Sequence, residues 1–105
     1  MNNFKHVGEV LNNLLLEKGV GQIILATDTG ITPKTINGII KGRNSISPYT
    51  AVLFEKYFPG HTAEAWLSIQ MDFDLKRARL KLEKRLDDDV KEAKKLSLNE
   101  KWEMK

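Results

Sequence analysis

The polar residues whose types suit recognition chemistry are concentrated in one short stretch of the chain. Lys34 can donate hydrogen bonds to O6 and N7 of guanine, and the amide of Asn37 can pair with an adenine edge. No acidic residue occurs between Thr29 and Glu55, and the charged residues there are Lys34, Lys41 and Arg43. The local basic charge and the base-reading side chains together predict contact with double-stranded DNA.

We expect these side chains to divide the work between bases and phosphates. Thr32, Lys34, Thr35 and Asn37 share the polar side of one predicted helix, whereas Lys41 and Arg43 leave its end toward the backbone of the nucleic acid. Helix starts bind phosphate through free N–H groups, so the predicted starts at Gln22 and Ser47, with Asn44 and Ser45 just before the latter, are expected anchors. Few of these side chains can read bases, so we expect DNA shape and dimer spacing to add specificity.

Other combinations of reactive residues point to structure rather than catalysis. His6 and Glu9 have the spacing of half a metal site, but no further ligands converge on them, and a helix start is the preferred interpretation. Glu64, Asp72 and Asp74 are interpreted as solvated or ion-paired carboxylates, since no phosphate loop or nucleophile elbow accompanies them. The chain has no cysteine. We therefore predict no enzyme activity, no metal and no cofactor.

Five helices are needed to position the recognition residues. Glycines at 19, 30, 42 and 60 each follow a helical pattern, and Thr32-Pro33 and Ser47-Pro48 are helix-start signals. The expected helices begin at His6, Gln22, Pro33 and Pro48, with the last starting after Thr62. Their expected apolar faces include Val10, Leu11, Leu14 and Leu15, then Ile23, Leu25 and Ala26, then Ile36, Ile39 and Ile40, then Ala51, Val52, Phe54 or Leu53, and Tyr57 or Phe58.

Residues 22 to 43 fit a helix-turn-helix, with Ala26 at the helix contact, Gly30 in the turn and Ile31 as the buried aliphatic residue after it. Two alternatives remain open from the sequence. Asn37-Gly38 is also the signature of a two-residue β-hairpin, and two packed helices without any DNA function would show the same glycine turn.

The last helix is long and carries an apolar stripe at steps of three and four residues. The stripe comprises Leu75, Ala78, Leu82, Leu86, Val90, Ala93 and Leu96. Trp66, Ile69 and Phe73 precede it and are expected to pack in the core, with a margin available for a dimer contact. The predicted dimer or partner interface is Trp66, Leu75, Ala78, Leu82, Leu86 and Val90. Ser97 and Glu100 form a second possible capping box, so the helix is expected to break near Leu96.

Size and composition fit a small cytoplasmic protein. The chain has 105 residues and a net charge of +3. It shows no apolar run of membrane-spanning length and no signal-peptide layout, so we predict no membrane association. Residues 80–105 contain eight Lys or Arg and seven Asp or Glu. That balance favours a solvated helix over a basic nucleic-acid arm.

With these features in place, the sequence resembles the HigA antitoxins, a branch of the phage-repressor-like (XRE) helix-turn-helix family. The resemblance covers His6 to Arg79. It rests on His6-Val7-Gly8-Glu9, on Leu25-Ala26 with Gly30-Ile31-Thr32, on Thr35-Ile36-Asn37 with Gly42, and on Trp66-Leu67-Ser68-Ile69-Gln70 with Phe73-Asp74-Leu75.

The resemblance implies a dimeric repressor of its own operon that also neutralises a ribosome-dependent RNA-cleaving toxin. It places the DNA contacts at Gln22, Thr32, Pro33, Lys34, Thr35, Asn37, Gly38 and Arg43. Pro33 and Gly38 stand where polar side chains are common in the family, and Val7 where proline is common, so the operator cannot be inferred.

The resulting prediction is an all-α protein with a five-helix lambda-repressor-like domain at residues 1–79 and a charged helical extension at residues 80–105. Its expected partners are operator DNA, a toxin and a second copy of the chain. A stand-alone repressor without a toxin, or an adaptor whose tail binds proteins, remains the alternative.

Overall fold

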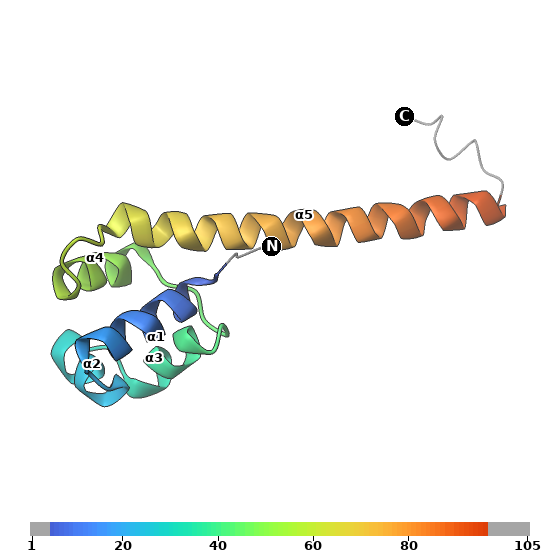
Figure 1. Cartoon of the computed structure of the whole chain (residues 1–105). Coiled ribbons are helices and arrows are strands. Elements are labelled where there is room, and N and C mark those ends of the chain that lie inside the picture. The colour runs from blue at the N-terminus through green and yellow to red at the C-terminus, as the bar shows by residue number, and fades with distance from the viewer. Residues whose placement is uncertain (1–4, 97–105) are drawn as a thin grey trace. The chain divides into compact units, whose positions relative to one another are not determined.

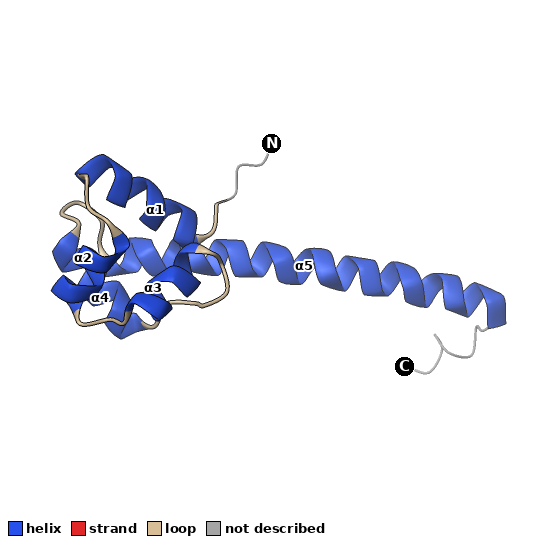
Figure 2. Cartoon of the chain, turned by 90° about the horizontal axis from the view of Figure 1, so that it is seen from below, coloured by secondary structure: helices blue, strands red, loops and turns tan. Residues whose placement is uncertain are grey.

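The computed structural model describes residues 5–96, and within them the chain forms five helices and no strand (Figures 1 and 2). The helices are α1 (Val7–Lys18), α2 (Gln22–Thr29), α3 (Pro33–Ile40), α4 (Pro48–Tyr57) and α5 (Ala63–Leu96). The predicted five-helix, all-α fold with a long last helix is confirmed. None of the described helices has both the length and the apolar character needed to cross a membrane.

The chain divides into two compact units, residues 1–73 and residues 74–105, and α5 contributes its first turns to one and the rest to the other. The predicted domain boundary after Arg79 remains a prediction. The predicted capping pair of Ser97 and Glu100 lies outside the described residues.

Side-chain caps start the helices where the sequence indicated. Thr32 Oγ1 accepts a hydrogen bond from Thr35 N at 3.2 Å, and Ser47 Oγ accepts one from Thr50 N at 3.1 Å. His6 caps α1 with its imidazole, since Nδ1 accepts from Gly8 N at 2.9 Å. Each of these bonds satisfies an N–H group that has no partner inside its helix.

The start of α5 has two such bonds. Thr62 Oγ1 accepts from Ala65 N at 3.1 Å, and Glu55 Oε1 on α4 accepts from Ala63 N at 2.7 Å. Glu64 adds a carboxylate to the first turn, where it complements the helix dipole. The predicted start after Thr62 is confirmed, and α4 helps to hold it.

The core of the first unit is built from one face of each helix. Its largest fully buried side chains are Leu11, Leu25, Ile36, Ile39, Phe54 and Trp66. Two residues expected in this core are exposed instead, Ile23 at 62% and Val52 at 42%. Each is out of register with the buried face of its helix, which follows Leu25 and Ala26 in α2 and Ala51 and Phe54 in α4.

Trp66 occupies the centre of an aromatic cluster. Its ring centroid lies 5.1 Å from that of Phe54 and 5.8 Å from that of Phe58, and the side chain is 1% exposed. Its expected place in a dimer or partner interface is therefore corrected, because packing in the core leaves no Trp66 surface for a partner to contact.

The described side chains of the second unit, residues 74–90, are all exposed. The large apolar ones, Leu75, Leu80, Leu82, Leu86 and Val90, are between 42% and 57% exposed. Exposure of so many apolar side chains to water on one helix is energetically unfavourable, and a partner that covered them would remove this cost.

Candidate nucleic-acid interface

The turn between α2 and α3 is held by Gly30, which the sequence marked for it, and by Thr29, which it did not. Gly30 has a φ of 82°, which L side chains rarely adopt, and its N–H donates to Ala26 O at 2.8 Å. Thr29 Oγ1 donates to Leu25 O at 2.8 Å and accepts from Ile31 N at 3.3 Å. Ala26 is buried at the helix contact. The helix-turn-helix geometry predicted for residues 22 to 43 is present.

The sequence Asn37-Gly38, which could also have formed a β-hairpin turn, lies in a helix. Both residues lie within α3, which buries Ile36, Gly38 and Ile39. The opposite side of α3 presents Lys34 and Thr35 to solvent, and Thr32 precedes them at the cap. The hydroxyl of Thr32 also donates to that of Thr35 at 3.0 Å. The solvent side of α3 is thus polar and carries one positive charge.

Asn37 is held between two neighbours inside the protein. Its Nδ2 donates to Gln22 Oε1 at 3.3 Å, and its Oδ1 accepts from Arg43 Nη2 at 3.4 Å. This chain of bonds links the start of α2, the middle of α3 and the loop that follows α3. Asn37 therefore orients Gln22 and Arg43, and it would have to release one of them to pair with an adenine.

The loop after α3 folds back onto the buried side of that helix. Gly38 O accepts from Arg43 N at 2.8 Å and from Asn44 N at 3.1 Å. A Cβ at position 38 would collide with the Asn44 side chain, approaching its Cγ to 2.8 Å. Gly38 was expected to contact DNA. The structure instead buries it beneath Asn44, where a residue without a side chain lets the loop close.

Gln70 on α5 holds the other end of this loop and was not singled out from the sequence. Its Oε1 accepts from Ile46 N at 2.7 Å, and its Nε2 donates to Ile46 O at 3.0 Å. The paired bonds satisfy both backbone groups of a buried residue. The available signal was a polar side chain one turn after Trp66 on an otherwise apolar helix face.

A hydrogen bond between side chains ties α4 to the recognition elements. Tyr57 donates to Asp28 Oδ2 at 2.8 Å, and Lys18 Nζ lies 5.3 Å from the centre of the tyrosine ring. Partial burial raises the pKa of the Tyr57 phenol above its ordinary value of 10.0, and the hydrogen bond and charge of Asp28 raise it further. The phenol is therefore neutral at physiological pH.

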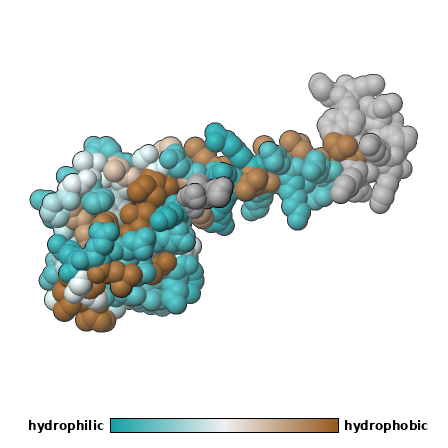
Figure 3. Space-filling model, in the orientation of Figure 1, coloured by the Kyte–Doolittle hydropathy of each residue, from teal (hydrophilic) through white to brown (hydrophobic). Residues whose placement is uncertain are grey.

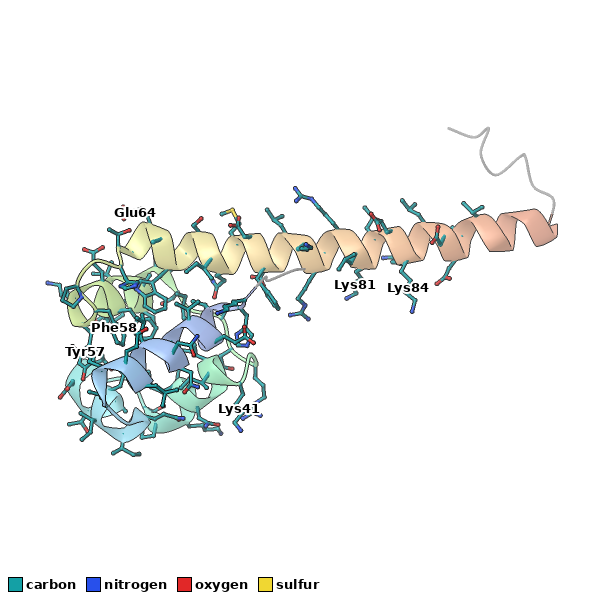
Figure 4. The ribbon with its side chains drawn as sticks, in the orientation of Figure 1. Lys41, Tyr57, Phe58, Glu64, Lys81 and Lys84 are labelled. Carbon is teal, nitrogen blue, oxygen red and sulfur yellow. The ribbon has the colours of Figure 1, made fainter. Side chains whose placement is uncertain are left out.

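The predicted DNA-binding residues other than Gly38 differ in how exposed their side chains are. Gln22 and Asn37 are half-buried, whereas the rest are exposed: Thr32, Pro33, Lys34, Thr35, Lys41, Arg43, Asn44 and Ser45. Figure 4 shows Lys41 on the opposite side of the first unit from Tyr57 and Phe58. The structure thus brings the exposed residues of the set together on α3 and its following loop.

His6, one of the two residues with metal-site spacing, has a structural role. The His6 imidazole caps α1 and meets the ring of Phe73 edge-on, with centroids 5.6 Å apart. Among the described residues, no group of three His, Cys, Asp or Glu side chains could hold a metal ion. His6 therefore acts by capping α1 and by packing against Phe73.

We compared the chain with known protein families, protein sequences and solved structures. No protein-family model matches the chain. It is 35% identical over 74 residues to virulence-associated protein I of Dichelobacter nodosus, covering 70% of this chain and 68% of that protein. It is also similar to the solved structure of the Pseudomonas aeruginosa antitoxin HigA with the higBA promoter, with a TM-score of 0.73 and 25% identity over 82% of this chain and 94% of that one.

Similarity to a second solved structure indicates the family to which the chain belongs. An addiction module antidote protein of the HigA family from Coxiella burnetii matches with a TM-score of 0.71 and 31% identity, covering 83% of this chain and 95% of that chain. The match covers most of this chain, in agreement with the resemblance seen in the sequence. The chain belongs to the HigA family of helix-turn-helix antitoxins.

Proposed function

We propose that this protein binds its operator as a dimer, represses its own operon and neutralises a ribosome-dependent RNA-cleaving toxin. The observation that carries the DNA-binding half is the exposed polar surface of α3 and its loop, in a stretch with three basic residues and no acidic one from Thr29 to Phe54. Family membership and the promoter complex of a related antitoxin support the same function.

In this proposal α3 enters the major groove. An α-helix with its side chains is about 10–12 Å in diameter, which fits the major-groove width of about 12 Å. Lys34 then reaches the base edges from the first turn of α3. The free N–H groups at the starts of α2 and α4 approach phosphates on either side, as helix N-termini do at anions.

The loop after α3 supplies the remaining backbone contacts. Lys41, Arg43, Asn44 and Ser45 are exposed there, and Gln70 and Gly38 fix the loop to the domain. Asn37 acts mainly by aiming Arg43. Direct base reading therefore rests on few side chains, and sequence-dependent DNA shape contributes to the choice of operator.

The test is binding to the promoter upstream of the gene, measured by fluorescence anisotropy over a range of salt concentrations. Lys34→Ala should weaken binding to that promoter by about 1–3 kcal/mol and relax discrimination at one base position. Arg43→Ala should weaken binding about equally for all sequences and reduce the salt slope by about one.

Lys56→Ala is the charge-matched control. Lys56 is exposed in the last turn of α4, next to Tyr57, which lies away from Lys41 (Figure 4). Its removal should leave affinity within about twofold, the scale of one distant screened charge. Wild-type protein that shows no salt-dependent promoter binding would remove the repressor function and favour an adaptor.

The toxin half of the proposal needs a separate experiment. Co-expression with the neighbouring small open reading frame should restore growth and yield a complex that co-purifies. Growth arrest by that reading frame without rescue, together with no complex, would reduce the function to that of a stand-alone repressor.

A further inference from the structure

A pocket of the first unit lies at the C-terminal end of α1, between that helix and the turn that joins α4 to α5. Its volume is about 250 Å³. The residues that line it come from α1 and from the turn: Leu14, Glu17, Lys18, Phe58, Pro59 and His61. The three from α1 are three and four positions apart, so they share one face of the helix. Phe58 lies on the opposite side of the first unit from Lys41, so the pocket is separate from the surface proposed to contact DNA (Figure 4).

Backbone hydrogen bonds fix the turn that forms one wall of the pocket. Phe58 N donates to Phe54 O at 2.8 Å, and His61 N donates to Phe58 O at 3.1 Å. Gly60 has a φ of 90°, a left-handed conformation that lets the chain turn between them. A wall that is held in this way binds a ligand without the cost of ordering it first.

The lining combines apolar side chains with charges of both signs. Phe58 is buried and Leu14 is half-buried, and with Pro59 they form the apolar part. Glu17 and Lys18 are exposed and carry opposite charges. Figure 3 shows such apolar patches, in brown, among hydrophilic residues on the surface of the first unit. The pocket suits a molecule with an apolar part and one group of each charge, because a few polar groups orient a ligand in a mainly apolar site.

The volume of the pocket selects a small ligand. Pockets for drug-sized molecules measure about 300–1,000 Å³, and this one is smaller. At about 30 Å³ per water molecule it has room for about eight waters, and valine, leucine and methionine have about that number of non-hydrogen atoms.

We propose that the pocket binds a free α-amino acid with an apolar side chain. The carboxylate of the ligand pairs with Lys18, its ammonium group pairs with Glu17, and its side chain packs on Leu14 and Phe58. The C-terminal end of α1 carries the negative end of the helix dipole, which also favours the ammonium group. Binding at this site goes beyond the proposed contacts with DNA and toxin and does not depend on them.

Lys18 is oriented by a neighbouring aromatic ring. Its Nζ lies 5.3 Å from the centre of the Tyr57 ring, within the range of a cation–π interaction. Tyr57 is itself held by its hydrogen bond to Asp28, at 2.8 Å. A lysine with fewer accessible conformations loses less entropy when it pairs with a carboxylate.

His61 has a buried nitrogen that the packing of the protein leaves unsatisfied. Its Nδ1 has no hydrogen-bond partner among residues 5–96, and the same holds for Nε1 of Trp66, whose ring centroid lies 6.1 Å from that of His61. Native proteins keep few such atoms, because each one lowers stability. With Nδ1 unbonded, rotation of the His61 ring toward the ligand carboxylate costs no hydrogen bond.

Titration of L-leucine into the isotope-labelled full chain, followed by NMR, tests the site. The backbone amides of Lys18, Phe58 and His61 and the indole N–H of Trp66 should shift together and saturate. The expected Kd is about 1 mM or tighter, within the reach of a ligand of this size. Isocaproate lacks the ammonium group and isopentylamine lacks the carboxylate, so each should bind at least threefold more weakly. N-acetyl-leucinamide lacks both charges and should bind at least tenfold more weakly.

Two results of this titration would overturn the proposal. One is the absence of saturable shifts with L-leucine, L-valine and L-methionine at about 10 mM, tenfold above the expected Kd. The other is binding of N-acetyl-leucinamide as tight as that of L-leucine, because the pocket would then recognise an apolar side chain of a peptide.

Substitution of the charged residues tests their contacts with the ligand. Lys18→Met and Glu17→Gln should each weaken L-leucine binding at least threefold, because each removes one charge and keeps the length of the side chain. Lys56→Gln and Glu9→Gln are the matched controls, since both residues are exposed and lie outside the set that lines the pocket. The controls should stay within about twofold of the parent. Equal losses in all four variants would assign the effect to net charge and contradict the site.

His61→Phe distinguishes a ligand contact from a structural role. Phenylalanine keeps a ring beside Trp66 and removes the buried nitrogen that lacks a partner. The variant should unfold at the same urea concentration as the parent or a higher one, and yet bind L-leucine at least threefold more weakly. Binding equal to that of the parent would contradict a ligand contact by His61, and a loss of stability would contradict the unsatisfied nitrogen.

Discussion

Gln70 bonds to both backbone groups of Ile46 and so helps to hold the loop carrying Arg43, Asn44 and Ser45. In Gln70→Glu, the carboxylate can still accept from Ile46 N but cannot donate to Ile46 O, so a buried acceptor loses its partner. The expected loss is about 1–3 kcal/mol in the free energy of unfolding. Urea denaturation measures that loss, and faster amide hydrogen exchange at Ile46 would show loosening of the loop.

Ser68→Glu is the control for this substitution. Ser68 is exposed on the same helix, so it receives the same added charge without losing a bond to the loop. Promoter affinity should fall in Gln70→Glu and stay within a few fold of the parent in Ser68→Glu. Equal losses in both would assign the effect to charge and contradict a positioning role for Gln70.

Tyr57 gives the first unit a pH dependence in the alkaline range. Its pKa is raised in the folded state by partial burial and by Asp28, so its stabilising contribution is complete below the unfolded pKa of about 10 and is lost as pH rises through the folded pKa. Below pH 10 the parent should be more stable than Tyr57→Phe by about 0.5–1.5 kcal/mol, toward the lower end for a partly exposed bond.

The measurement is the free energy of unfolding of the parent and of Tyr57→Phe as a function of pH. The difference between the two should shrink once Tyr57 ionises. Absorbance titration of Tyr49→Phe, in which Tyr57 is the remaining tyrosine, locates that ionisation independently. A constant difference across the titration would contradict the role of the Asp28 bond.

At the scale of elements, the contact between α1 and α3 is set by Gly8. A Cβ at this position would collide with Ile39 O and would approach Ile39 C to 2.8 Å. Backbone cannot move aside as a side chain can, so Gly8→Ala should cost about 1–3 kcal/mol or more by overpacking. Gly21→Ala is the comparison, since no atom lies within 4 Å of a Cβ there. Thermal denaturation of both should show the larger loss in Gly8→Ala.

The helices and their ends could be predicted from the sequence because their signals are local. Thr32 with Pro33 and Ser47 with Pro48 act within four residues, and the structure has α3 and α4 begin there. The face that each short helix buries is a tertiary property. Ile23 and Val52 were assigned to the core by their apolar side chains, yet helices of eight and ten residues bury too few positions to define the register unambiguously.

For the candidate site, the sequence indicated which polar residues of α3 are exposed but not which residues hold the following loop. Lys34 and Thr35 are exposed, as their polar side chains suggested. Asn37, Gly38 and Gln70 act through contacts between residues 5 to 24 positions apart in the sequence. Spacing along a single helix contains no information about such contacts, and so the fixing of the loop appears only in the folded chain.

For the whole molecule, dimerisation and DNA binding should be linked through the operator. A dimer that reads two half-sites gains from a high effective concentration at the second site once the first is bound. DNA with two half-sites one helical turn apart should therefore bind at least tenfold more tightly than DNA with one. Insertion of about five base pairs between them turns one half-site to the opposite face of the duplex and should remove most of the gain.

Anisotropy titrations with the three duplexes measure this linkage, and Leu82→Glu, which places a charge in the predicted dimer interface, is the expected monomeric reference. If α5 joins the two copies, that variant should bind the one-site and two-site duplexes with affinities that differ only by the statistical factor of about two. Its affinity for a single half-site should equal that of the parent, because Leu82 lies outside the first unit and α3 is unchanged. A parent that also binds both duplexes alike would show that each copy recognises DNA alone, and dimerisation would then have no part in operator choice.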